Sequence, residues 1–303
     1  NYGTLIDYFN GQKDIKEKVI RALHNLSFVE DPTRVLRAIR FEQRFGFKIG
    51  KLTNALMKNA VRINSFKELS GRRLFLELKL LLMEQEPLKT IERMNTFDLL
   101  QFISPEIVFT KELKDLLEEI KSVIAWFKLL YLEEPYEPWK VYWHGLTSSL
   151  DKKALHRLGE RLQMVDQESL RMISQRDGLG GVLGRLYKFE GDNNYDLYTL
   201  LAHYDIETLL YTVARANNKK TKRLISNYFT KLKGTKIKLK GMDLKGMGFK
   251  PGPLYKEIFE SLLKARLNNL ISTREDEIGF VKETFGRDFF QGGVVERKVE
   301  RRI

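Results

Sequence analysis

The sequence predicts an all-α protein, on two observations. Apolar residues recur at helical spacing through most of the chain, and no segment alternates as a β-strand does. Helix-starting residues such as Asp31 and Ser70 precede these apolar segments, while proline and glycine mark their boundaries. The length of 303 residues suits two or three compact units.

The first 26 residues are too short to be a domain. They contain an apolar start, a turn at Asn10 and Gly11, and a predicted charged helix over residues 14–23.

The next predicted helix begins at Asp31, a good N-cap, with Pro32 in the first turn, and runs to about Gly46. At about 100° per residue, its apolar residues fall on two opposite sides and its arginines in a band between them. One side holds Val35, Leu36 and Ile39, the other Ala38, Phe41 and Phe45, and the band Arg37, Arg40 and Arg44. These arginines must reach water, pair with carboxylates or meet an anionic partner, because an unpaired buried charge is costly.

Asp31 and Arg34 are three residues apart, so both side chains can project from the first turn. A carboxylate only accepts hydrogen bonds and a guanidinium only donates them, so together they complement an edge with an amino donor beside a ring-nitrogen acceptor. Adenine and cytosine carry this edge, whereas uracil and guanine present the opposite pattern. The alternative is an ordinary helix cap with a surface ion pair.

Further helices are expected along the chain, with Ser70 as an N-cap, a boundary at Pro87, and a loop with two prolines over residues 134–139. The expected helices span residues 52–61, 71–83, 111–132, 153–163, 195–201, 206–216 and 254–270. A glycine-dense passage is the best candidate for a hinge or domain boundary, and it contains Gly178, Gly180, Gly181 and Gly184.

Residues 231–250 are rich in lysine and interspersed with glycine, which would set flexible cations near a backbone that phosphates can approach. The predicted RNA-binding residues are Lys236, Lys238, Lys240, Lys245 and Lys250. The alternative is a solvated loop that joins two helices.

The formal net charge of +13 implies a field that attracts polyanions. The chain has no cysteine, which excludes disulfides and thiolate metal sites and agrees with a cytoplasmic location. No apolar run approaches the roughly 20 residues that span a bilayer, so no membrane partner is expected. The four histidines show no metal-ligand spacing, and no metal site is predicted in this chain.

Residues 30–47, EDPTRVLRAIRFEQRFGF, resemble the neck-helix motif of the bacterial class II tRNA nucleotidyltransferases (CCA-adding enzymes) and poly(A) polymerases. Asp7, Gly11 and Asp14 resemble the segment that closes the family's catalytic head, and residues 70–82 its next helix. Residues 241–277 are similar to its C-terminal segment. The resemblance implies an elongated all-α neck, body and tail. It also implies nucleotide-binding roles for Glu30, Asp31, Arg34, Arg37, Arg40, Arg72, Arg73 and Glu77.

The chain departs from the family in lacking both a Gly-Ser dipeptide and an Asp-x-Asp motif, where the family's metal-binding carboxylates stand. We therefore expect Mg²⁺ to be bound by a catalytic head that is covalently attached upstream or on a separate chain, and the present chain to be inactive alone. ATP, with CTP as a second candidate, is the expected substrate, and the 3′ end of tRNA or another RNA the expected partner.

The function predicted from this resemblance is base selection and RNA binding within a template-independent RNA nucleotidyltransferase. A free-standing helical RNA-binding module without activity is the alternative. The expected divisions are residues 1–26 (end of the head), 27–100 (neck), 101–175 (body), 176–285 (tail) and 286–303 (charged extension).

Overall fold

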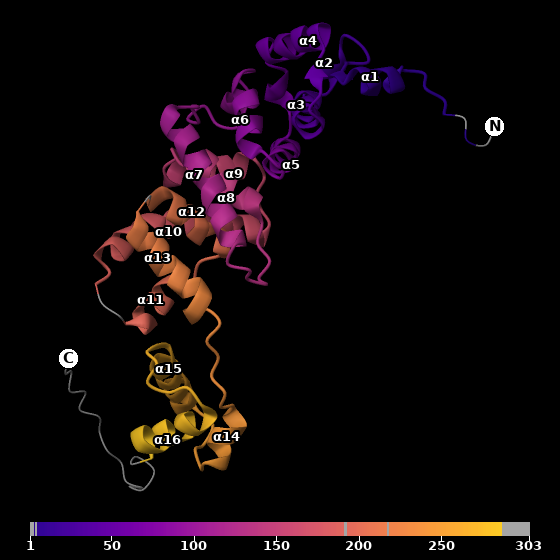
Figure 1. Ribbon diagram of the computed structural model, residues 1–303. Coiled ribbons are helices and arrows are strands. Elements are labelled where there is room, and N and C mark those ends of the chain that lie inside the picture. Colours follow the sequence, from indigo (N-terminus) through magenta and orange to yellow (C-terminus); the bar gives the residue numbers. More distant parts are fainter. Residues whose placement is uncertain (1–2, 4, 191–192, 217, 287–303) are drawn as a thin grey trace. The chain divides into compact units, whose positions relative to one another are not determined.

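The computed structural model describes residues 3, 5–190, 193–216 and 218–286 (Figure 1). This part of the chain is all-α apart from a pair of two-residue strands, which confirms the predicted fold class. It forms two compact units, which are considered separately. Unit 1 comprises Asn1–Arg185 and Tyr204–Asn218, and unit 2 comprises Leu186–His203 and Lys219–Ile303. Residues 287–303 of the expected charged extension lie outside the described residues.

The elements that begin in unit 1 are α1 (Gly11–Glu17), β1 (Val19–Ile20), α2 (Ser27–Glu30), α3 (Thr33–Phe45), β2 (Lys48–Ile49), α4 (Lys51–Arg62), η1 (Ser65–Glu68), α5 (Gly71–Leu82), α6 (Pro87–Asn95), η2 (Leu100–Phe102), α7 (Lys111–Lys128), α8 (Pro138–Leu146), α9 (Lys152–Arg161), α10 (Gln167–Lys188) and α12 (Ile206–Ala216). Those of unit 2 are α11 (Asn194–Leu201), α13 (Lys219–Asn227), η3 (Tyr228–Leu232), α14 (Gly241–Gly246), α15 (Pro253–Leu267) and α16 (Arg274–Phe285).

The helix predicted over residues 14–23 is wrong in both position and length. α1 begins at Gly11, where the Asp7 carboxylate accepts hydrogen bonds from the backbone N–H groups of Gly11 (2.8 Å) and Gln12 (2.9 Å). These bonds lower the pKa of Asp7. Lys18 ends α1 in a left-handed conformation, with φ 54°. The β-branched residues that follow form β1, which pairs in parallel with β2.

α3 confirms the predicted helix, and Gly46 ends it with φ 63°, a conformation that favours glycine. One predicted apolar side is correct, because Val35, Leu36 and Ile39 are fully buried against α5 and α6. The opposite side is only partly covered, since Phe45 is 55% exposed and stacks with Phe41. The expectation of a helix covered on two sides is therefore wrong at its C-terminal end.

α5 begins where its backbone meets the end of α9. Ser70 caps α5 as predicted, because its hydroxyl accepts a hydrogen bond from the Arg73 N–H. A Cβ atom built on Gly71 would stand 1.6 Å from the Arg161 carbonyl oxygen. Only glycine fits at this contact, because a side chain there would overlap main-chain atoms that cannot rotate away.

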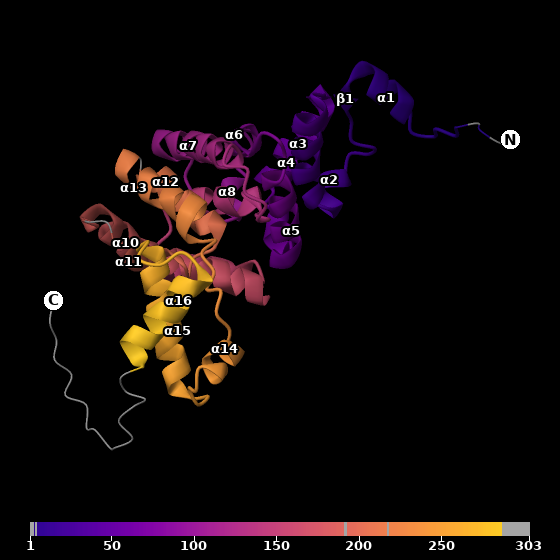
Figure 2. The ribbon, with the colours of Figure 1, turned by 60° about the horizontal axis from the view of Figure 1, so that its bottom comes forward.

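α7, α8 and α12 pack side by side around the largest buried side chains of unit 1 (Figures 1 and 2). Trp143 and Tyr211 are both buried at this contact, and His144 is 1% exposed with its ring 5.5 Å from that of Tyr211. Neither ring nitrogen of His144 has a hydrogen-bond partner among the described residues. Burial, with the nearby charges of Arg176 and Lys140, lowers the pKa of His144 to about 3.

Acidification should therefore destabilise unit 1 through His144. The unfolded chain takes up a proton near pH 6.5 while the folded chain does not until about pH 3, so this contribution is present above pH 6.5 and is lost as pH falls. Between pH 6.5 and 5.5 the loss should be about 1 kcal/mol. Urea unfolding should show that His144→Phe removes this part of the pH dependence. His203→Phe, at an exposed histidine, is the control; equal slopes in both variants would contradict the prediction.

Helices extend into the end of one expected loop and through the expected hinge, while residues 134–137 are non-helical as expected. Pro138 starts α8 inside the segment expected to be a loop, because proline is well suited to the first helical position. The glycine-dense passage from Gly178 to Gly184 lies within the continuous helix α10, so it is not a break in the chain. The units nevertheless divide between Arg185 and Leu186, directly after this passage, whereas the expected body–tail boundary at residues 175 and 176 falls inside α10.

Unit 2 contains a hydrophobic core between α14, α15 and α16. Its buried members include Leu244, Ile258, Leu262 and Val281, none of which is measurably exposed. Leu239, which precedes α14 in an irregular segment, joins the same core. Among the residues that the structure describes, no helix combines the length and the apolar character needed to cross a bilayer.

Candidate functional site

Asp31 occupies the junction between α2 and α3, where its backbone is extended. Its Oδ1 atom accepts three hydrogen bonds: from the Thr33 N–H (3.1 Å), the Thr33 hydroxyl (2.6 Å) and Nη2 of Arg73 in α5 (3.0 Å). Its Oδ2 atom accepts none from a described residue, and Nε of Arg34 lies 3.9 Å away. Asp31 thus accepts a hydrogen bond from the first residue of α3, although Pro32 is the N-cap residue, and its other carboxylate oxygen is left open.

The electrostatics of this position keep Asp31 ionised. Partial burial would raise its pKa, but the Thr33 hydroxyl and N–H and the charges of Arg73 and Arg34 outweigh it, so the pKa is lowered overall. An ionised Asp31 is a hydrogen-bond acceptor only, as the predicted base-reading role requires.

Arg34 lies beside Asp31 with about half of its side chain in solvent. Nη1 donates to the Ser27 carbonyl oxygen at 3.3 Å and stands 4.0 Å from the Glu30 carboxylate. Glu30 in turn lies 3.4 Å from His24 Nε2. The structure therefore brings Glu30, Asp31, Arg34 and Arg73 together at the start of α3, where a donor and an acceptor face solvent next to each other.

The other arginines of α3 have different environments. Nη1 of Arg40 lies 3.8 Å from Glu77 Oε2, and both side chains are largely buried. Neither Arg40 Nε nor Glu77 Oε2 makes a hydrogen bond to a residue that the structure describes. Arg44 forms a two-pronged contact with Glu84, at 3.1 and 2.6 Å. Arg37 is exposed and has no ion pair with a described residue. Pairing with carboxylates explains Arg40 and Arg44, and Arg37 reaches water.

Arg72 lies apart from this group, although it precedes Arg73. Its Nη1 is 3.4 Å from Asp166, and its guanidinium lies over the Phe75 ring. It lines a small cavity of about 140 Å³ together with Lys79, Trp139 and Asp166. Successive residues of a helix point about 100° apart, so Arg73 can reach Asp31 while Arg72 cannot follow it.

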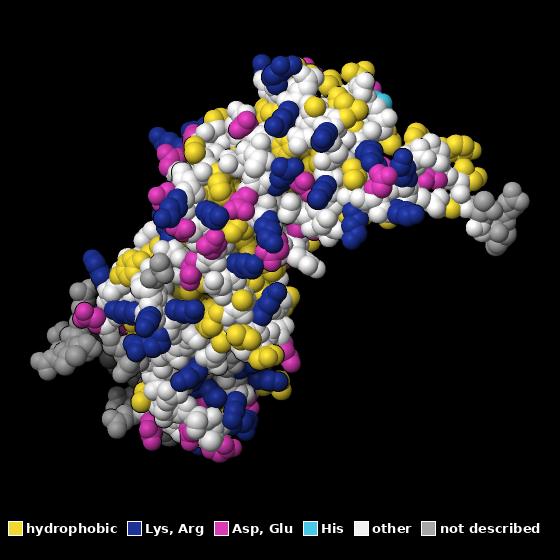
Figure 3. Space-filling view, turned by 45° about the horizontal axis from the view of Figure 1, so that its top comes forward, with side chains coloured by type: hydrophobic (Ala, Val, Ile, Leu, Met, Phe, Trp, Pro, Cys, Tyr) yellow, Lys and Arg dark blue, Asp and Glu magenta, His cyan; other side chains and the backbone are white. Residues whose placement is uncertain are grey.

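The lysines predicted to bind RNA belong to unit 2, and all five are exposed: Lys236, Lys238, Lys240, Lys245 and Lys250. None of them forms a salt bridge with a residue that the structure describes. Elsewhere lysine and arginine side chains are spread over the molecular face shown in Figure 3, with acidic side chains between them. The lysine-rich segment differs in that seven lysines within residues 231–250 accompany one acidic residue, Asp243.

The described residues contain no group of three histidine or acidic side chains placed to hold a metal ion. The side chains of the candidate site therefore do not fit Mg²⁺, and no step is assigned to it in this chain.

Two contributors to the site escaped the sequence analysis. Thr33 is 4% exposed and supplies two of the donors to Asp31 Oδ1, and the Ser27 carbonyl oxygen holds Arg34. The threonine two residues after an aspartate was a usable signal, because aspartate commonly accepts hydrogen bonds from that position. No signal in the sequence marked Ser27.

Comparison with known proteins links this chain to enzymes of tRNA processing. A family model described as "Probable RNA and SrmB-binding site of polymerase A" matches residues 46–110. An A-adding tRNA nucleotidyltransferase of Geobacter sulfurreducens is 44% identical over 91% of this chain and 32% of its own length. A second, from Aquifex aeolicus, is 34% identical over 89% of this chain and 32% of its own length. The chain thus spans about a third of these curated relatives.

Solved structures give the same result. A CCA-adding enzyme with ATP is 31% identical, with a TM-score of 0.71, over 96% of this chain and 68% of that one. A Thermotoga maritima CCA-adding enzyme complexed with tRNA is 30% identical, also with a TM-score of 0.71, over 92% of this chain and 67% of that one.

Proposed function

Because the chain belongs to the bacterial class II tRNA nucleotidyltransferase family and matches its C-terminal portion, we propose that it selects the nucleotide and binds the RNA in an enzyme that adds AMP to the 3′ end of tRNA or another RNA. CMP is the second candidate nucleotide. Support comes from the relatives, which include A-adding enzymes and a CCA-adding enzyme with ATP.

The open oxygen of Asp31 beside Arg34 is the observation that carries this proposal. Asp31 Oδ2 would accept a hydrogen bond from the amino group of adenine or cytosine, and Arg34 would donate one to the adjacent ring nitrogen. Uracil and guanine would set donor against donor and acceptor against acceptor on this pair. Arg73 and Thr33 hold Asp31 through its other oxygen, so the carboxylate is fixed before a nucleotide arrives.

The remaining predicted residues, except Arg72, have supporting roles in this proposal. Asp31 and Arg34 are called the reading pair. Arg37 is the exposed cation nearest to them in sequence and would face a phosphate of the bound nucleotide or RNA. Arg40 and Glu77 join α3 to α5, and so keep Arg73 opposite Asp31. Glu30 lies within 4.0 Å of Arg34 and restricts its position.

Catalysis itself is placed in a head domain, on the same polypeptide or on another chain. Mg²⁺ bound there would activate the RNA 3′ hydroxyl and stabilise the leaving pyrophosphate. A set of exposed apolar residues among the first 29 residues supports such a partner, because large exposed apolar side chains are frequent at interaction sites. It contains Leu5, Ile6, Tyr8, Phe9, Ile15, Leu23, Leu26 and Val29, all exposed.

The chain would act as a neck (27–100), a body (101–175) and a tail (176–285) of a cytoplasmic enzyme. Within it, the neck reads the nucleotide and the tail binds RNA.

Labelled ATP and CTP test whether this chain binds the RNA while a separate head domain carries out catalysis. The purified chain should bind tRNA with an affinity that falls steeply with salt, and should transfer no label to the RNA at any magnesium concentration, because the catalytic carboxylates are elsewhere. Transfer should appear when a catalytic head of the family is supplied. Label incorporation that survives repurification of the chain would overturn the assignment of catalysis to the head. Binding that never leads to transfer with any head would favour the free-standing RNA-binding module.

A further inference from the structure

The lysine-rich segment of unit 2 is held to the core at regular intervals. Leu239, Leu244 and Phe249 are five residues apart, and they are 3%, 0% and 4% exposed. Each is followed directly by an exposed lysine: Lys240, Lys245 and Lys250 respectively. The segment therefore does not behave as a solvated loop, because its apolar residues anchor the backbone while the lysines stay in solvent.

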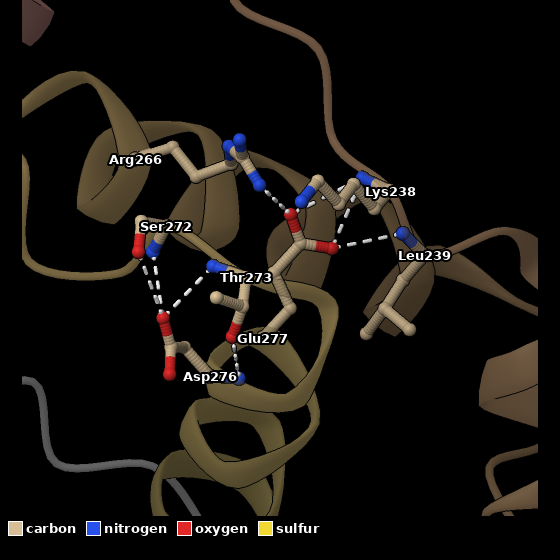
Figure 4. Close-up of polar contacts among 7 residues, drawn as sticks. All are labelled: Lys238, Leu239, Arg266, Ser272, Thr273, Asp276 and Glu277. Atoms are coloured by element: carbon tan, nitrogen blue, oxygen red, sulfur yellow. Dashed lines mark hydrogen bonds and ion pairs between the residues drawn. The ribbon is translucent and has the colours of Figure 1, made fainter.

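A buried carboxylate supplies a further anchor (Figure 4). Glu277 in α16 is 0% exposed, and it accepts hydrogen bonds from the backbone N–H groups of Lys238 (3.0 and 3.1 Å) and Leu239 (2.8 Å). Consecutive N–H groups that converge in this way form an anion-binding turn, which here is filled by the protein's own side chain. The contact joins residues that are 39 positions apart in the sequence.

Arg266 in α15 balances the charge of Glu277. Its Nη1 lies 2.6 Å from Glu277 Oε1, and its side chain is 16% exposed. A buried carboxylate needs such a partner, since an unpaired one would be strongly disfavoured. Glu277 thus joins the backbone at Lys238 and Leu239 to α16, and Arg266 joins Glu277 to α15.

Asp243, the one acidic residue of the segment, is also engaged. Its Oδ2 accepts a hydrogen bond from the Lys240 N–H (2.7 Å), and its Oδ1 pairs with Arg274 (2.6 Å). Arg274 offsets the charge of Asp243, so this carboxylate does little to reduce the positive field of the lysines around it.

We propose that Glu277 is a positioning residue for RNA binding: it fixes the backbone at Lys238 and Leu239, so that Lys236, Lys238 and Lys240 form a pre-ordered cationic ridge that contacts backbone phosphates of RNA. This inference rests on the proposed function, and it adds a defined phosphate-contact site and the residue that orders it. Fixing the backbone in advance removes part of the ordering entropy that a flexible lysine segment would lose on binding.

Two triple variants of equal charge test the ridge. One replaces Lys236, Lys238 and Lys240 with alanine, and the control replaces Lys256, Lys264 and Lys282, which are exposed on α15 and α16 of the same unit. Affinity for a labelled tRNA is measured from about 50 to 200 mM KCl. If the three ridge lysines each contact a phosphate, the ridge variant should lower the slope of log affinity against log salt by about 2 to 3. The control should lower it by less than 1. Equal losses would overturn the ridge, because they would show a general field only.

The Glu277→Gln variant tests the positioning role. It keeps the size of the side chain but removes the charge that holds two backbone N–H groups and Arg266. Hydrogen exchange at the Lys238 and Leu239 amides should become faster, and the salt slope should fall toward that of the ridge variant at a temperature where unit 2 remains folded. Faster exchange with an unchanged salt slope would overturn the positioning role.

The ridge variants keep the test decisive if Glu277→Gln fails to fold, because they change exposed side chains only. Failure of the proposed function is distinguishable from failure of this inference. If the unaltered chain does not bind tRNA at low salt, the proposed function fails. If it binds and the two triple variants behave alike, the ridge alone fails.

Discussion

Asp31→Asn should leave the melting temperature nearly unchanged and degrade the preference for ATP over UTP, in a preparation that carries the proposed head. Asparagine caps a helix about as well as aspartate, and its carbonyl oxygen can still accept from Thr33. The amide nitrogen, however, would present a donor to the amino group of adenine where Oδ2 now presents an acceptor. Thermal unfolding and the ratio of ATP to UTP incorporation are the two measurements.

Truncation of the reading pair should have a larger effect. Asp31→Ala and Arg34→Ala should each lower the efficiency of ATP use by about 1.5 to 3 kcal/mol, roughly tenfold to over a hundredfold, because each leaves a polar partner in the pocket unpaired. Arg44→Ala is a matched control on the same helix, since Arg44 pairs with Glu84 instead. Unchanged melting together with unchanged discrimination in Asp31→Asn would reduce Asp31 to an ordinary cap.

Gly71→Ala should destabilise unit 1 by roughly 2 to 4 kcal/mol, although alanine favours helices. The added methyl group would lie 1.6 Å from the Arg161 carbonyl oxygen and 2.7 Å from its carbon, so α5 or α9 must move. That movement would also displace Arg73 from Asp31, since Arg73 lies in the first turn of α5. Urea unfolding measures the loss.

A second glycine in a helix provides the control. Gly180 lies exposed in α10, and a Cβ atom there would meet nothing within 4 Å. Gly180→Ala should therefore stabilise the protein by up to about 1 kcal/mol through helix propensity alone. A similar loss in both variants would show that the close approach of α5 and α9 is not what makes Gly71 necessary.

The sequence predicted most helices because their signals are local. Residues 206–216 match α12 at both ends, and Ser70 and Gly46 cap α5 and α3 as expected. Errors occurred where a contact from elsewhere decides the conformation. β1 exists because Lys48 and Ile49 pair with it, and the glycines of α10 stay helical because Leu179 and Val182 between them are buried in the fold.

For the candidate site too, the sequence predicted what local spacing decides and missed what the packing of helices decides. Spacing placed Asp31 and Arg34 side by side, as the structure has them at 3.9 Å. Spacing separates Arg72 from Arg73 on the surface of α5 but could not tell which of them faces Asp31, because that depends on the arrangement of α5 against α3. The burial of Glu277 was equally hidden, since a charged residue within an acidic run is usually exposed.

The parallel pair of β1 and β2 also has a mechanical consequence. Val19 pairs with Lys48 and Ile20 with Ile49, so the chain ahead of α2 is fastened just beyond the C-terminal end of α3, far along that helix from Asp31. A force on the N-terminal segment would therefore act first on the β1–β2 pair, and the pair would transmit it to the whole of α3. Asp31 and Arg34 would then move together with α3 as one body. The segment before α2 would not pull on them directly.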